Sequence, residues 1–139
     1  MNTAFLPVIL FVIAGIMAFS TGTSWGSFGI LLPIAGEIAV STDVALLLPA
    51  MAAVLAGAVF GDHCSPISDT TILSSTGAGS NHMDHVLTQL PYAIISAVIA
   101  AVGYVLIGFT GSTIIALVTV AILLVVFYFL LGKKTQVHE

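Results

Sequence analysis

Residues 44–76 read VALLLPAMAAVLAGAVFGDHCSPISDTTILSST, and this stretch decides the fold. It opens with an uncharged apolar run, Val44 to Phe60, which is stopped by the polar string Gly61 to Asp69. A helix that crosses a bilayer needs about 20 consecutive, mostly apolar residues. The stretch therefore predicts a membrane helix that is interrupted beside two carboxylates, Asp62 and Asp69.

The composition of the whole chain agrees with a membrane protein. Of its 139 residues, 59% are hydrophobic and only 6% are charged, whereas a soluble domain carries roughly 25% charged residues. The lipid bilayer is thus the expected partner. Two basic residues, Lys133 and Lys134, leave no cationic surface for nucleic acid. The single cysteine, Cys64, excludes an intrachain disulfide and a zinc site built on several thiolates.

Outward from the central stretch, the chain divides into further apolar pieces. We predict a single transmembrane domain over residues 1–139, with helical pieces at about 5–20, 28–40, 44–60, 69–76, 87–108 and 112–131. The piece 28–40 would reach only about 20 Å, short of the roughly 30 Å hydrocarbon core, and is predicted to be a half-helix. The piece 87–108 carries small residues that would let helices approach closely, namely Ala93, Ser96, Ala97, Ala100, Ala101 and Gly103.

The two lysines also predict the orientation. Positive residues favour the cytoplasmic side of a membrane, so Lys133 and Lys134 predict a cytoplasmic carboxy terminus in a multi-pass protein of the cell membrane. Two crossings earlier, the loop around His82 to His85 would lie on the same side.

Two polar strings interrupt the apolar chain, Thr21 to Ser27 and Gly61 to Asp69. Non-helical backbone at membrane depth persists only where protein or trapped water satisfies its polar groups. Each break therefore predicts an internal cavity with hydroxyl and carbonyl ligands, and an external loop with capping Ser and Thr side chains stays open as the alternative. The candidate hydroxyl ligands are Thr21, Thr23, Ser24, Ser65, Ser68 and Thr70.

The second break carries the acidic candidates. A carboxylate inside a membrane is costly and is by default a candidate functional group. Pro66 makes a continuous helix unfavourable, so Cys64 and Ser65 are predicted to be extended and Asp69 to lie near the start of the next helical piece. Asp69 as a simple helix-capping acid stays open. No second cysteine or helical histidine pair accompanies His63, which argues against structural zinc.

Both strings resemble motifs of the NhaC-type Na⁺/H⁺ antiporters, relatives of the malate/lactate antiporters within the ion-transporter superfamily. The strings are Thr21-Gly22-Thr23-Ser24-Trp25-Gly26 and Gly61-Asp62-His63-Cys64-Ser65-Pro66-Ile67-Ser68-Asp69-Thr70-Thr71; Gly77-Ala78-Gly79-Ser80-Asn81-His82 and Thr88-Gln89-Leu90-Pro91-Tyr92 are also similar to that family. The resemblance implies an all-α integral membrane bundle of inverted repeats with discontinuous helices. Thr21 to Ser27 would be the tip of a re-entrant hairpin.

Members of that family are longer, so the chain resembles their carboxy-terminal portion. The resemblance implies one half of an inverted-repeat transporter, which would need a second transporter half or self-association. It also implies that Asp62 to Asp69 is the unwound middle of a crossing helix.

The expected function is Na⁺/H⁺ antiport through a carboxylate site at the middle of the membrane, or that of the ion-binding half of such an antiporter. Asp62 would be the principal exchangeable carboxylate, and Asp69 a second acid or a structural partner. Burial favours the neutral form of a carboxyl group, so a proton and Na⁺ would compete for the same oxygens. His63 would tune the site, Gly22 would lie at the tip, and no cofactor is expected beyond the transported ions. No nucleophile motif predicts an enzyme.

Two alternatives remain. The first is a Na⁺- or H⁺-coupled carrier of organic anions such as lactate or malate, with the substrate carboxylate at the half-helix that starts near Phe28. The absence of arginine weakens it, because the bidentate clamp for a carboxylate is missing. The second is a membrane subunit or truncated remnant that does not transport.

Overall fold

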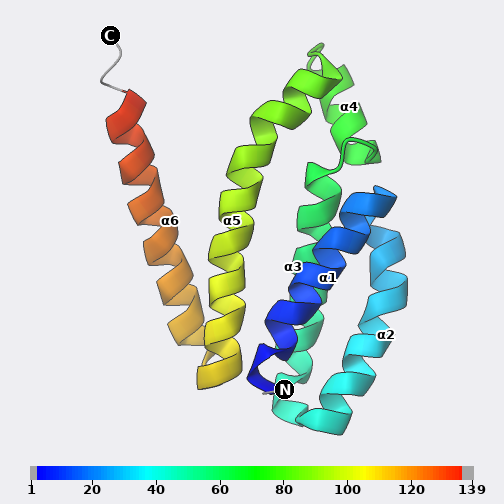
Figure 1. The fold of residues 1–139 in the computed structure, drawn as a ribbon, viewed down its shortest axis with the longest axis vertical. Coiled ribbons are helices and arrows are strands. Elements are labelled where there is room, and N and C mark those ends of the chain that lie inside the picture. Colours follow the sequence, from blue (N-terminus) through cyan, green and yellow to red (C-terminus); the bar gives the residue numbers. More distant parts are fainter. Residues whose placement is uncertain (1–2, 136–139) are drawn as a thin grey trace.

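The computed structural model describes residues 3–135, with side chains through Leu130, and this part of the chain is helical with short connections (Figure 1). Five segments are long and apolar enough to cross a membrane. The predicted all-α integral membrane bundle is therefore confirmed. The elements are η1 (Thr3–Phe5), α1 (Leu6–Thr21), α2 (Ser24–Thr42), η2 (Val44–Leu46), α3 (Leu47–Cys64), α4 (Asp69–Gly77), α5 (His82–Thr110) and α6 (Thr113–Thr135).

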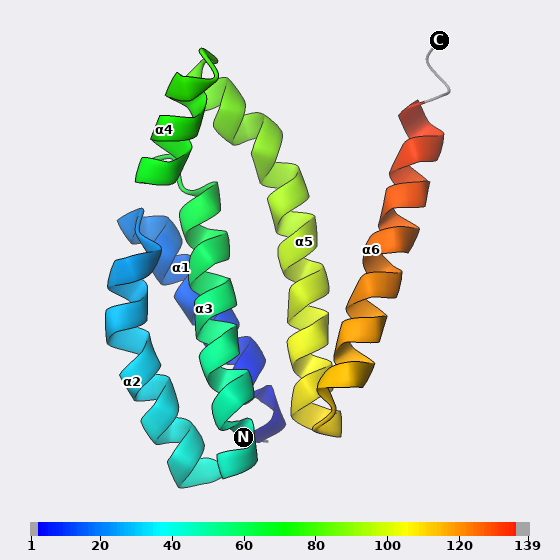
Figure 2. The ribbon, with the colours of Figure 1, turned by 180° about the vertical axis from the view of Figure 1, so that it is seen from behind.

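Helices α1 and α2 form an antiparallel hairpin whose outer ends lie at the same end of the bundle (Figures 1 and 2). Gly22 ends α1 with a positive φ of 70°, and its N–H donates to the Ala18 carbonyl. Thr23 is extended and precedes the first residue of α2. Glycine adopts this left-handed conformation without steric cost, which makes it suited to the turn.

The prediction for the first break is wrong in extent. Only Gly22 and Thr23 are non-helical, and α2 begins at Ser24 rather than Phe28. Its 19 residues exceed a half-helix. The Ser27 hydroxyl explains part of the error, since it donates to the Thr23 carbonyl at 3.1 Å and so satisfies a polar side chain within the helix.

The second break is confirmed, but it begins later than predicted. Helix α3 continues through Asp62 and His63 to Cys64, so the prediction of an extended Cys64 is wrong. Polar side chains alone do not end this helix; Pro66 does, because it has no N–H to donate to the carbonyl four residues earlier. Ser65 is extended, with φ −72° and ψ 128°. Helix α4 then continues toward the same end of the bundle as α3 (Figure 1).

Close packing of α1 against α3 fixes the hairpin on the broken helix. A Cβ atom at Gly57 would lie 2.1 Å from the Phe11 carbonyl oxygen, and one at Gly61 would lie 2.0 Å from the Gly15 carbonyl oxygen. Glycines four residues apart let two membrane helices bring their main chains together. The small residues of 87–108 predicted close approach of helices, and Gly103 does lie against Val120. The sequence did not predict the contact between α1 and α3.

Helices α5 and α6 complete the bundle on the side of α3 away from α2. Helix α5 starts five residues earlier than predicted, capped by the Asn81 side chain, which accepts from the Met83 N–H at 2.9 Å. The Tyr104 hydroxyl donates to the Ala52 carbonyl of α3 at 3.0 Å. The α4–α5 turn and the last turns of α6 lie at the same end of the bundle, opposite to η1 (Figure 2).

Candidate ion-binding site

The Asp62 carboxylate lies where the hairpin tip meets the helix break. Its Oδ2 accepts a hydrogen bond from Ser24 Oγ at 3.1 Å, and its Oδ1 accepts one from Ser68 Oγ at 2.5 Å. Ser24 is the first residue of α2, and Ser68 precedes the first residue of α4. Both serines are buried, and Asp62 is half-buried. Two hydroxyls from different elements thus converge on one carboxylate.

Thr70 extends this group. Its Oγ1 lies 2.8 Å from Ser68 Oγ, and its main-chain N–H donates to the same oxygen at 3.2 Å. The oxygens of Asp62, Ser24, Ser68 and Thr70 together form what we name the oxygen cluster. It contains one formal negative charge and otherwise neutral hydroxyl oxygens, which is a ligand set that suits hard cations such as Na⁺.

Helix ends set the electrostatics of the oxygen cluster. Asp62 lies in the last turn of α3, where the helix dipole disfavours a negative charge. The amino-terminal ends of α2 and α4, which favour negative charge, contribute the two hydroxyls that contact it. The break therefore places Asp62 at the unfavourable end of α3 but also brings it to the favourable start of α4.

Two further contacts join the hairpin tip to the break. Ser65 is fully buried, and its hydroxyl donates to the Phe19 carbonyl at 2.8 Å. That carbonyl belongs to the last turn of α1, where carbonyls lack partners within the helix. On the other side of the tip, a Cβ atom at Gly22 would lie 2.8 Å from the Ile67 carbonyl oxygen. Main chain thus packs on main chain next to the oxygen cluster.

The remaining residues singled out from the sequence lie around the oxygen cluster and not in it. The Thr21 hydroxyl donates to the Met17 carbonyl at 2.9 Å within α1, and the Thr23 carbonyl accepts from Ser27. The Asp69 and His63 side chains are exposed. No hydrogen bond between described residues joins the Asp69 carboxylate to the oxygen cluster.

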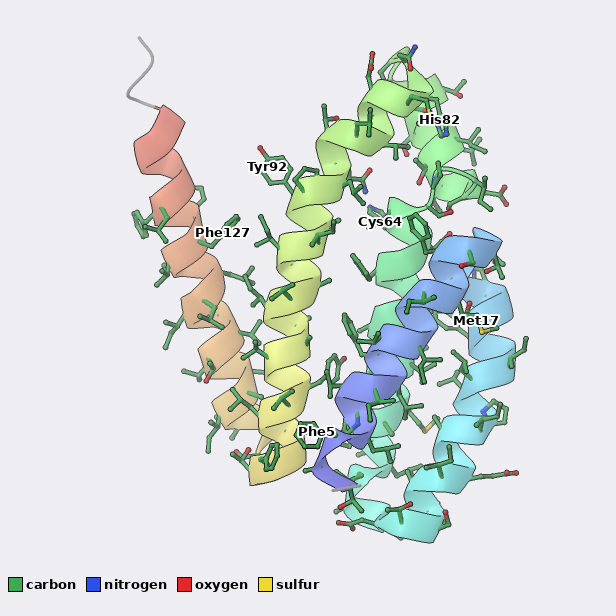
Figure 3. The ribbon with its side chains drawn as sticks, in the orientation of Figure 1. Phe5, Met17, Cys64, His82, Tyr92 and Phe127 are labelled. Atoms are coloured by element: carbon green, nitrogen blue, oxygen red, sulfur yellow. The ribbon has the colours of Figure 1, made fainter. Side chains whose placement is uncertain are left out.

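Two side chains of α5 that the sequence analysis did not select hold carbonyls of the break. His82 Nε2 lies 2.7 Å from the Pro66 carbonyl oxygen, and Gln89 Nε2 donates to the His63 carbonyl at 3.0 Å. Figure 3 shows His82 at the end of α5 that faces α4. The available signal was its place in the string Gly77 to His82, which was interpreted as part of a surface loop and noted for its family resemblance.

A polar cavity adjoins the oxygen cluster at Thr70. Its volume is about 300 Å³, and its lining consists of polar side chains from α3, α4 and α5, namely His63, Thr70, Thr71, Ser74, His85 and Gln89. Water occupies a cavity when it is roomy and offers several polar partners. The oxygen cluster therefore borders a space that suits water on one side and the packed α1–α3 interface on the other.

Comparison with known proteins assigns the chain to a family. Residues 1–109 match the Na⁺/H⁺ antiporter family. An uncharacterized protein of Haemophilus influenzae is 58% identical over 94% of this chain, and this region makes up 25% of that relative. The malate-2H⁺/Na⁺-lactate antiporter of Bacillus subtilis is 40% identical over 70% of this chain and 21% of its own.

A third relative, an uncharacterized Na⁺/H⁺ antiporter of Haemophilus influenzae, is 38% identical over 75% of this chain and 22% of its own. No solved structure gives a significant match. The chain spans about a quarter of the length of these relatives. The match is to antiporters and not to enzymes, as the sequence analysis expected. With its broken helix and hairpin tip, the chain belongs to the Na⁺/H⁺ antiporter family.

Proposed function

We propose that the chain is the ion-binding part of a Na⁺/H⁺ antiporter and that Asp62 is the carboxylate that exchanges Na⁺ for a proton. The observation that carries the proposal is the convergence of Ser24 and Ser68, from two different elements, on Asp62. Membership of the antiporter family and five apolar helices support a transport role. The transported ions are the cargo, and we propose no resident cofactor.

Competition between the two ions follows from the chemistry of the oxygen cluster. A hydroxyl group both donates one hydrogen and accepts through its lone pairs. Ser24 and Ser68 can therefore donate to an ionised Asp62, as they do here, or rotate and present their oxygens to a cation beside it. A proton on Asp62 removes the charge that attracts Na⁺, so binding of one ion releases the other.

The other predicted site residues have accessory roles in this proposal. Gly22 and Ser65 keep the hairpin tip on the break, while Thr21 and Thr23 shape the tip itself. Asp69, which is exposed, would attract an approaching cation through its charge, and His63 would tune the site from the lining of the polar cavity. The carboxy terminus would be cytoplasmic, on the same side as the α4–α5 turn.

The direct test is Na⁺ binding to the purified chain in detergent, measured by sodium NMR and calorimetry. Asp62→Asn keeps the size of the side chain but removes its charge, and we expect it to abolish Na⁺ binding. Asp84→Asn is the matched control, because Asp84 is exposed in the first turn of α5, outside the oxygen cluster. Wild-type affinity in Asp62→Asn would remove Asp62 from the mechanism.

Exchange across a bilayer is proposed to need more than this chain. Alternating access requires two elements that move past a shared site, and the chain spans about a quarter of its relatives. We propose that it works as one half of an inverted repeat, with a re-entrant α1–α2 hairpin, and that a second half or a second copy completes it. Na⁺-dependent proton release from liposomes, with and without a co-expressed partner, measures this requirement.

One relative favours a second candidate function. The Bacillus subtilis relative is named for malate and lactate as well as Na⁺ and protons, which supports a coupled carrier of organic anions. Uptake of labelled lactate by the completed transporter would favour this candidate. Absence of both Na⁺ binding and lactate uptake would favour the non-transporting subunit or remnant.

A further inference from the structure

We propose that His82 is a positioning residue for the ion site: it ties the helix break to α5 and thereby holds Ser68 in place beside Asp62. The inference rests on the proposed role of Asp62. His82 is the first residue of α5. Its ring contacts the connection between α3 and α4 and also α4 itself. Nε2 lies 2.7 Å from the Pro66 carbonyl oxygen, and Nδ1 lies 3.1 Å from Ser75 Oγ on α4.

The Pro66 carbonyl needs this partner. It lies in the non-helical connection between α3 and α4, where no ladder of main-chain hydrogen bonds satisfies it. A buried carbonyl without a partner is costly, so loss of the ring favours rearrangement of the connection. Ser68 follows two residues later and donates to Asp62 at 2.5 Å. Only Ile67 lies between Pro66 and Ser68, so a shift of Pro66 is transmitted along the main chain to the oxygen cluster.

The hydrogen atoms available at Ser75 show which form of the ring holds the break best. A carbonyl only accepts, so Nε2 must carry a hydrogen. Ser75 Oγ has one hydrogen and also lies 2.9 Å from the Ile72 carbonyl oxygen. A neutral ring leaves that hydrogen shared between Ile72 and Nδ1. A ring with hydrogens on both nitrogens donates to Pro66 and Ser75 while Ser75 donates to Ile72, so all three contacts form together.

The contacts of the His82 ring are made with Pro66 and Ser75. The elements packed around it carry other titratable side chains, and none of them forms a hydrogen bond or ion pair with the ring in the described part of the chain. These are Asp84 and His85 on α5, Asp69 on α4, and Asp62, His63 and Cys64 on α3. The His82 ring is thus positioned by its contacts with Pro66 and Ser75.

Amide hydrogen exchange of the full chain in detergent tests the contact without requiring Na⁺. The reporters are the Thr70 and Ile72 amides, which donate to Ser68. We expect their protection to fall about tenfold or more in His82→Leu. His82→Gln keeps a donor and an acceptor, so it should retain most of the protection. Met83→Leu, at an exposed position of the same helix, should match wild type.

Sodium affinity of the same variants separates the two proposals. We expect weaker Na⁺ binding in His82→Leu and recovery in His82→Gln. Wild-type protection or wild-type Na⁺ affinity in His82→Leu would overturn the positioning role. Loss of protection in His82→Leu, with no Na⁺ binding even by the wild type, would instead overturn the proposed function and support the contact between His82 and the break.

Discussion

Replacing Gly61 by alanine tests whether the packing of α1 on α3 sets the geometry of the oxygen cluster. The added Cβ atom would meet the Gly15 carbonyl oxygen at 2.0 Å and the Phe19 nitrogen at 2.8 Å. Both are main-chain atoms, so neither can rotate away. Ordinary contact begins at 3.4 Å, and the two helices must therefore separate by about 1.4 Å at this point.

Two consequences follow from that separation. Overpacking of a close helix contact costs about 1–3 kcal/mol of stability. Phe19 belongs to α1 and Ser65 follows the last residue of α3. The separation therefore also stretches the hydrogen bond from the Ser65 hydroxyl to the Phe19 carbonyl, which is 2.8 Å long. A hydrogen bond lengthened by more than 1 Å is lost. We therefore expect Gly61→Ala to weaken Na⁺ binding even though residue 61 lies outside the oxygen cluster.

Reversible unfolding in mixed detergent micelles measures the stability change, and sodium NMR measures the binding change. Gly36→Ala is the matched control, because Gly36 lies within α2 and a Cβ atom there would meet nothing within 4 Å. Alanine has a higher helix propensity than glycine, so this control variant should be as stable as the wild type or more stable. Equal stability of Gly61→Ala and Gly36→Ala would refute the close α1–α3 contact.

Three further predictions test individual contacts. Gly22→Ala should lose more stability than Gly79→Ala in the same unfolding assay, because both glycines have positive φ but only Gly22 also faces a carbonyl; equal losses would contradict the contact between tip and break. Ser68→Ala should lower Na⁺ affinity up to about tenfold, as expected for one lost hydrogen bond, and unchanged affinity would exclude its hydroxyl from the oxygen cluster. Tyr104→Phe should cost about 1 kcal/mol of stability through the lost bond to Ala52, while Tyr92→Phe, at an exposed position, should cost nothing measurable.

The sequence predicted the membrane bundle and the second break because both depend on local properties. Apolar length marks a spanning helix, and a proline interrupts one wherever it stands. The predicted helix boundaries are less accurate, because the prediction ends helices at polar residues such as Asp62 and Ser24. Both residues are helical, and their side chains form a hydrogen bond with each other.

The assembly of the site was not predictable in this way. Ser24 and Asp62 are 38 residues apart, and their pairing depends on how the hairpin lies on α3. The spacing of Gly57 and Gly61 is the sequence signal for that packing, although it does not identify α1 as the partner. The string Gly77 to His82 likewise suggests a turn, but only the fold brings His82 to Pro66.

The seam between the α1–α2 hairpin and the broken helix has a mechanical consequence. Ser24 lies on one side of that seam and Ser68 on the other, with Asp62 between them. A displacement of the hairpin wide enough to admit a hydrated ion would also separate Ser24 from Asp62, two of the groups proposed to bind the ion. In the proposed transporter, access of the ion and its release would then be a single event, so a mutation that eases one should ease the other in proportion.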